Sequence, residues 1–179
     1  MKNKVYLILI AILSLVSCQK EYQAPQSATQ AMAGRWWVQV YLDLDANGTA
    51  DDVNDVLAMD FSDFGQFGLV TSNTAANDAD SVIIDDQELF YYMRGVVPVD
   101  LATLTFIPAT VLNINPTAYL GTGETLTVVN GGIFKGAGHS KSGRAADSIN
   151  IALQFSDSPG DQFILTGHRD SGQPEDQYQ

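Results

Sequence analysis

The feature that most constrains the fold of this chain is a series of short strand-like segments that begins after Gly34. The first, Trp37–Leu42, is rich in aromatic and β-branched residues, which suit the half-buried surface of a sheet. Turn signals such as Asn77-Asp78 and Ser158-Pro159-Gly160 separate the segments that follow. Only residues 50–59 are compatible with a short helix as well as with a strand. The pattern predicts an all-β domain.

About ten short strands in one domain fit either a single antiparallel barrel or a two-sheet sandwich. The clearest hairpin is expected over residues 126–134, with Asn130-Gly131-Gly132 as its turn. The segments expected as strands are 37–42, 56–61, 67–74, 81–85, 89–97, 101–107, 111–114, 125–129, 133–135, 148–155 and 162–167.

The run Gly34-Arg35-Trp36 favours the barrel, because it resembles the Gly-x-Trp arrangement at the first strand of lipocalin-like barrels. In such barrels the Trp closes one end, and an Arg near the last strand stacks over it. Arg169 follows the last expected strand here, so the resemblance implies a cation–π stack on Trp36, worth about 0.5–2 kcal/mol. The alternative is a sandwich in which Trp36 and Trp37 are ordinary core residues.

The N-terminal segment indicates a lipoprotein. Two lysines precede the apolar run Val5–Val16, which as a helix would span only about 18 Å of a ~30 Å hydrocarbon core, as in a secretory signal. Leu15-Val16-Ser17-Cys18 resembles the bacterial lipobox, which implies cleavage before Cys18 and lipidation of that residue. We therefore expect a signal peptide over 1–17, a flexible tether over 18–33 and a barrel domain over 34–179.

The residues after the cysteine bear on location and partners. Gln19 stands where an Asp would signal inner-membrane retention, and Cys18-Gln19-Lys20-Glu21 is similar to a surface-export signal of Bacteroidetes lipoproteins. These features predict an outer-membrane lipoprotein that faces the periplasm or the cell surface. The formal net charge of −12 repels phosphate backbones and excludes a nucleic-acid partner. A single cysteine excludes an internal disulfide framework.

Eight short runs between Gly34 and Asp176 together form a recognisable pattern. They are Gly34-Arg35-Trp36-Trp37, 71–78, Pro98-Val99-Asp100-Leu101, 131–136, Ser142-Gly143, Asp147-Ser148-Ile149, Phe155-Ser156-Asp157 and Gly167-His168-Arg169. The segment that contains them resembles a family of Bacteroidetes lipoproteins described as lipid-binding putative hydrolases, with a lipocalin-like (calycin) fold. The resemblance implies a small apolar ligand and supplies no catalytic residues.

Aromatic residues supply the expected ligand pocket. Every position of Leu89-Phe90-Tyr91-Tyr92-Met93 is apolar or aromatic, so one face of that segment is available for a ligand. Phe90, Tyr92 and Phe106 are the expected lining. The alternative is that core and loops bury both faces. No cofactor is required by this non-catalytic binding function.

A weak serine-type lipid hydrolase or esterase is an alternative function. His139 lies in a glycine-rich loop beside Ser140 and Ser142, and Asp147 is placed to orient the imidazole, which gives a nominal Ser/His/Asp set. The chain has no Gly-x-Ser-x-Gly nucleophile elbow, so a solvated hairpin loop explains the same residues.

A further alternative is a structural or interaction lipoprotein whose acidic loop binds Ca²⁺. Asp43, Asp45, Asn47 and Asp51 match positions one, three, five and nine of a calcium loop. Position twelve is Asn54 instead of the bidentate Glu, so the ion would have only a structural role. A solvated acidic connection is the competing interpretation.

Overall fold

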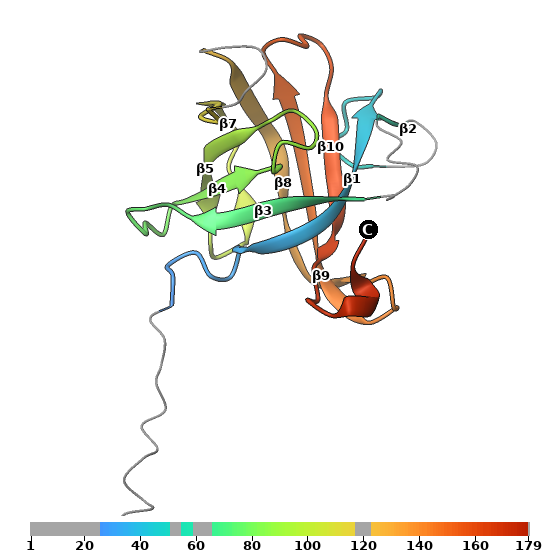
Figure 1. The fold of residues 1–179 in the computed structure, drawn as a ribbon. Helices are drawn as coiled ribbons and strands as arrows, with labels where there is room; N and C mark the ends of the chain where they lie inside the picture. Colours follow the sequence, from blue (N-terminus) through green and yellow to red (C-terminus); the bar gives the residue numbers. More distant parts are fainter. Residues whose placement is uncertain (1–25, 51–54, 59–65, 117–122, 179) are drawn as a thin grey trace, which may run out of the picture.

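The computed structural model describes residues 26–50, 55–58, 66–116 and 123–178, and within them the chain forms a closed antiparallel β-barrel of eight strands (Figure 1). Each barrel strand pairs with the next one along the chain, and the last pairs with the first. This confirms the all-β, lipocalin-like barrel and excludes the sandwich. The barrel strands are β1 (Gly34–Asp43), β3 (Phe67–Asn73), β4 (Ser81–Asp85), β5 (Arg94–Asp100), β6 (Thr105–Phe106), β8 (Thr125–His139), β9 (Ala145–Phe155) and β10 (Phe163–Arg169).

Three short elements complete the described part of the chain. β2 (Asp55–Leu57) pairs with the end of β1, and β7 (Ala109–Leu112) pairs with the first residues of β8. Pro108 separates β6 from β7, since proline has no N–H to continue the ladder. A single 3₁₀ turn, η1 (Pro174–Asp176), follows β10. None of the helical segments described here is long and apolar enough to cross a bilayer.

The two ends of the barrel differ. β1 ends and β10 begins at the upper end, whereas both termini of the described chain lie at the lower end (Figure 1). Cys18 and the expected signal peptide lie outside the described residues. Residues 28–32 form turns, and the Met32 side chain is fully buried in the core. The folded part therefore begins before Gly34, inside the segment expected as a tether.

Trp36 fills the lower end of the barrel. Its side chain is fully buried, and its indole N–H donates to Thr71 Oγ1 at 2.8 Å. The Thr71 hydroxyl in turn donates to the carbonyl oxygen of Met32. Arg169 lies directly opposite Trp36 in the β1–β10 ladder, and its guanidinium carbon is 4.9 Å from the Trp36 ring centroid. The same guanidinium donates to Ala33 O, so a single side chain links the first strand, the last strand and the residue that precedes the first strand.

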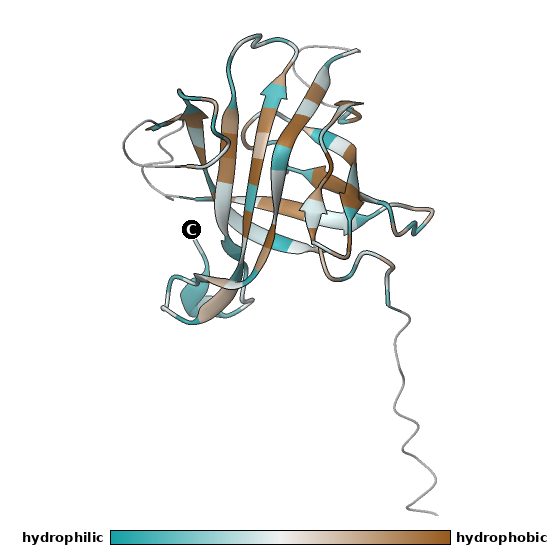
Figure 2. Ribbon diagram, turned by 180° about the vertical axis from the view of Figure 1, so that it is seen from behind, coloured by the Kyte–Doolittle hydropathy of each residue, from teal (hydrophilic) through white to brown (hydrophobic). Residues whose placement is uncertain are grey.

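Alternation along the strands builds the core. Hydrophobic and hydrophilic residues alternate along the strands in Figure 2, and the inward set forms one contiguous cluster. Val38, Val40 and Leu165 are among its fully buried members. The outward set on β9 and β10 includes Asn150 and Thr166, which face each other across the ladder.

The hairpin expected over 126–134 is not formed. β8 continues through Asn130-Gly131-Gly132, and a bulge between Val128 and Asn130 takes up the irregularity. Gly131 has φ 144°, and a Cβ there would lie 2.4 Å from Asn150 O, so the glycine allows β8 and β9 to approach closely. The strand expected from Leu89 also begins later, at Arg94, because residues 86–93 form a loop.

We expect Thr71→Val to lower the free energy of unfolding by about 1–3 kcal/mol, because it leaves the buried Trp36 N–H and the Met32 carbonyl without their hydroxyl partner. Thr110→Val, on the exposed side of β7, is the matched control and should change stability by less than about 0.5 kcal/mol. Urea unfolding measures both values. Equal effects of the two substitutions would contradict this account of the lower end.

Candidate functional site

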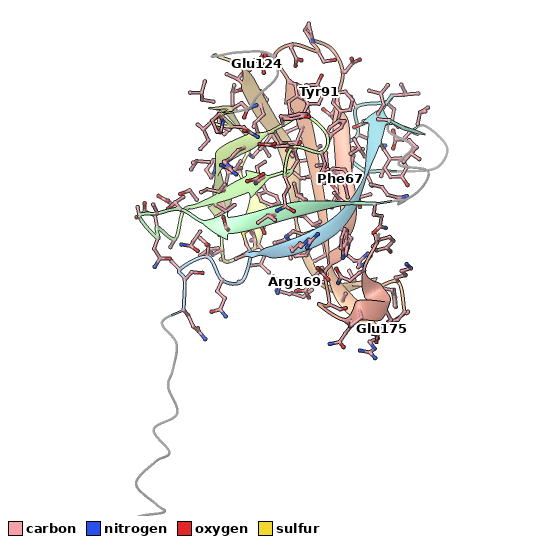
Figure 3. All side chains as sticks on the ribbon, viewed as in Figure 1. Phe67, Tyr91, Glu124, Arg169 and Glu175 are labelled. Carbon is pink, nitrogen blue, oxygen red and sulfur yellow. The ribbon has the colours of Figure 1, made fainter. Side chains whose placement is uncertain are left out.

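Five aromatic rings gather at the upper end of the barrel. Phe90 contacts all the others, with centroid distances of 5.1 to 6.3 Å, and Tyr91 stacks on Phe155 at 3.8 Å. Tyr91 and Phe67 lie above Arg169 in Figure 3. We refer to this set as the aromatic cluster. Its members come from β3, the β4–β5 loop, β9 and β10: Phe67, Phe90, Tyr91, Phe155 and Phe163.

A buried carboxylate holds the loop that carries two of these rings. Asp86 is fully buried, and its oxygens accept backbone N–H groups from Glu88, Phe90, Tyr91 and Met93 at 2.6–3.2 Å. Burial raises the pKa of Asp86, and these hydrogen bonds to the ionised form act in the opposite direction. The side chain thus organises the whole β4–β5 loop, a role that the sequence analysis did not assign.

The same loop is conformationally strained. Gln87, Glu88 and Tyr92 have φ values of 54°, 65° and 51°, in the left-handed region that residues other than glycine rarely adopt. Such strain persists only where surrounding contacts over-determine the backbone, and it is concentrated at ligand clamps and switch segments. The hydrogen bonds to Asp86 provide that restraint here.

The expected lining residues occupy different places. Phe90 is central to the aromatic cluster. Tyr92, two residues further along the chain, has 38% of its surface exposed. Phe106 on β6 is buried in the core, and within the described residues neither Tyr92 nor Phe106 has a ring contact with the cluster. The sequence analysis did not include Phe155 and Phe163 in the expected lining. Phe155 ends β9 and Phe163 begins β10, so the two residues flank one short connection, and this position was the available signal.

The members of the nominal Ser/His/Asp set have other surroundings than a catalytic triad requires. Ser140 is buried and shares a hydrogen bond with Ser142, while His139 is exposed at the end of β8. Asp147 accepts from Lys135 Nζ at 2.9 Å and from the N–H of Gly136. Partial burial alone would raise the pKa of Asp147, but these hydrogen bonds lower it. No hydrogen bond between described residues joins any two of Ser140, His139 and Asp147.

The loop around these serines is tied to the C-terminal segment. Asp176 is buried and accepts from the Ser171 hydroxyl and the N–H of Ser142. These hydrogen bonds hold the pKa of Asp176 well below its usual range. Arg144 also pairs with Glu175 at 3.2 Å, so the β8–β9 loop is bound to the C-terminal segment at the lower end. We refer to these contacts of Asp176, Ser142, Ser171, Arg144 and Glu175 as the Asp176 clamp.

The acidic loop brings three carboxylates together. Asp43, Asp45 and Asp55 each place one oxygen so that these atoms lie within 4.8 Å of one another. Asp43 also accepts N–H groups of Asn47 and Gly48 and the Gln162 amide, and these contacts lower its pKa although burial acts to raise it. Asn47 donates to Asp45, and Asp51 lies outside the described residues. Asp55 is the third carboxylate of this cluster, although it was not among the four residues that the sequence assigned to the calcium loop.

This fold, with Trp36 and Arg169 joined at one end and aromatic rings at the other, defines a lipocalin-like β-barrel protein. Residues 21–174 match a family model described as "lipid-binding putative hydrolase", and the chain belongs to this family. A search of curated proteins found no significant match.

The calcium interpretation stays a prediction, and thermal unfolding tests it. Because three clustered carboxylates repel one another, a bound Ca²⁺ should raise the melting temperature, and a chelator should reverse the rise. Asp45→Asn should abolish the rise, whereas Asp78→Asn, exposed near the lower end, should retain it. A wild-type melting temperature that does not change when Ca²⁺ is added would exclude the site.

His168 makes the fold sensitive to acid. Burial lowers the pKa of His168, against a smaller raising effect of Asp176 and Asp170, and its Nε2 has no hydrogen-bond partner among the described residues. The unfolded chain therefore takes up this proton more readily, so stability falls as the pH drops below about 6.5.

We expect the melting temperature to decrease from about pH 7.5 to about pH 5, and to decrease less in His168→Gln. His139→Gln, at an exposed position, should decrease as much as the wild type. Identical pH profiles for the wild type and His168→Gln would refute this assignment.

Proposed function

We propose that the protein is a membrane-anchored lipid-binding barrel that takes a small apolar molecule into the aromatic cluster. The observation that carries this proposal is the set of five rings at one barrel end that are joined through contacts with Phe90, two of them on the strained β4–β5 loop. The lipid-binding family to which the chain belongs supports the same ligand class.

Binding would proceed by exchange of ring–ring contacts for ring–ligand contacts. Outward movement of the β4–β5 loop separates Tyr91 from Phe155 and exposes apolar surface to the ligand. Each Å² of apolar surface removed from water contributes about 25 cal/mol, and aromatic side chains present large areas for this. Release of the left-handed backbone at Gln87 and Glu88 lowers the cost of opening.

Charge at the upper end favours a ligand without a negative headgroup. Partial burial raises the pKa of Tyr91, and the negative charges of Asp157 and Asp161 raise it further. Glu124 lies at the same end (Figure 3), and its pKa is raised by desolvation and by Asp157. These carboxylates repel a fatty-acid carboxylate, so a neutral lipid is the preferred occupant.

Anchoring is the second part of the proposal. Lipidation of Cys18 would attach the protein to the outer membrane, and the start of the described chain, drawn in blue, approaches the barrel from the lower end (Figure 1). The aromatic cluster then lies at the end away from the attachment point. Mass spectrometry of the mature N-terminus tests lipidation, and an unmodified Cys18 would contradict it.

Titration with diphenylhexatriene, a neutral apolar fluorophore, tests the ligand site. We expect saturable binding that Tyr91→Gln weakens about tenfold, because the ring no longer covers the bound molecule. Tyr178→Gln is the matched control at the lower end and should bind as the wild type does. The anionic cis-parinaric acid should bind more weakly than diphenylhexatriene.

The proposal fails if the wild type gives no saturable signal, or if both tyrosine variants lose the same affinity. A melting curve of each variant shows that the barrel is intact. An interaction protein without a lipid ligand would give the first of these results.

A further inference from the structure

The outer surface of the barrel carries a second hollow, separate from the aromatic cluster. It has a volume of about 660 Å³ and lies over β6, β8, β9 and β10, beside the loop that follows β1. We refer to it as the lateral groove. It is lined by Gly48, Thr49, Thr105, Phe106, Pro108, Asn130, Gly131, Phe134, Ser148, Ile149, Asn150 and Thr166.

A row of residues crosses these four strands. The ladders place Thr105 opposite Gly132, Gly132 opposite Asn150, and Asn150 opposite Thr166. Thr105, Asn150 and Thr166 line the groove, and their side chains are polar, as expected for the outward face of these strands.

The polar groups of the lateral groove are available to a ligand. Among the described residues, the side chains of Asn130, Ser148, Asn150 and Thr166 have no hydrogen-bond partner in the protein. Asn150, Ser148 and Thr166 are partly buried, and their polar atoms remain accessible from the groove. An amide presents two donors and an acceptor, and a hydroxyl presents both, so the groove can pair with either kind of group.

An exposed aromatic ring borders these groups. Phe134 lies opposite Ser148 in the β8–β9 ladder, and 53% of its surface is exposed. The exposed face of this ring is therefore available for contact with a bound molecule. Among the residues that the structure describes, no charged side chain lines the groove, although the chain has a net charge of −12.

We propose that the lateral groove binds a neutral saccharide. A sugar ring has hydroxyl groups around its edge that donate and accept, which matches unpaired amides and hydroxyls. It also has an apolar C–H face that packs on the electron-rich face of an aromatic ring such as Phe134. The described lining contains no Lys, Arg or carboxylate, which argues against an anion or a metal ion, and the polar edges argue against an acyl chain. The volume is within the range of small-molecule sites.

The saccharide site is independent of the proposed lipid function. Its lining shares no residue with the aromatic cluster. Phe134→Ala should therefore leave diphenylhexatriene binding unchanged. A negative result for one of the two proposals does not contradict the other.

The test screens the intact folded protein against an array of neutral oligosaccharides and titrates the strongest hit by calorimetry. We expect a dissociation constant no weaker than about 1 mM for the wild type, and a loss of about tenfold or more in Phe134→Ala and in Asn150→Ala. Leu112→Ala is the matched control, because Leu112 has 54% exposure on β7 and does not line the groove. It should bind as the wild type does.

The proposal is overturned if no neutral oligosaccharide binds, if only charged ones bind, or if Leu112→Ala loses as much affinity as Phe134→Ala. Sedimentation velocity tests the remaining alternative, in which the groove is an interface between two copies of the chain. A dimer that dissociates on the Phe134→Ala substitution would assign the groove to a second copy of the chain and would also overturn it.

Discussion

Pairing of β1 with β10 is the interaction on which the rest of this structure depends. It joins residues 36–42 to 163–169 and closes the sheet, which leaves the barrel strands without a free edge along that seam. Gly167 makes the approach possible, because a Cβ there would overlap the Trp37 carbonyl oxygen at 1.9 Å. Closure separates an interior filled by apolar side chains from an exterior on which polar rows can form.

The two ends of the closed barrel have different physical properties. The lower end is fixed by Trp36, Arg169 and the Asp176 clamp, whose hydrogen bonds and ion pairs join segments far apart in the sequence. The upper end is covered by rings, two of them on a loop whose backbone is strained and whose N–H groups donate to one buried carboxylate, Asp86. A binding site fits the second end, because rings in contact can part without breaking a ladder of hydrogen bonds.

Local signals in the sequence predicted an all-β domain, and the resemblance to lipocalin-like barrels favoured the barrel over the sandwich. The same resemblance implied that Arg169 stacks on Trp36, and the structure places the two side chains in contact. Asn130-Gly131-Gly132 has the composition of a turn, yet close approach to β9 makes it a bulge within β8. Asp86 converts an apolar segment with strand character into a loop, and nothing in its sequence neighbourhood indicates which N–H groups it accepts. For the same reason the nominal Ser/His/Asp set could be written down from sequence, although no hydrogen bond between described residues joins its members.

The most direct test of the lipid-binding account is a crystal structure of the protein purified from its natural host. The account predicts an apolar molecule in the aromatic cluster, with the β4–β5 loop moved outward and the Tyr91–Phe155 centroid distance longer than 3.8 Å. Rings that remain stacked at that distance, while a bound lipid occupies a different place on the barrel, would contradict it.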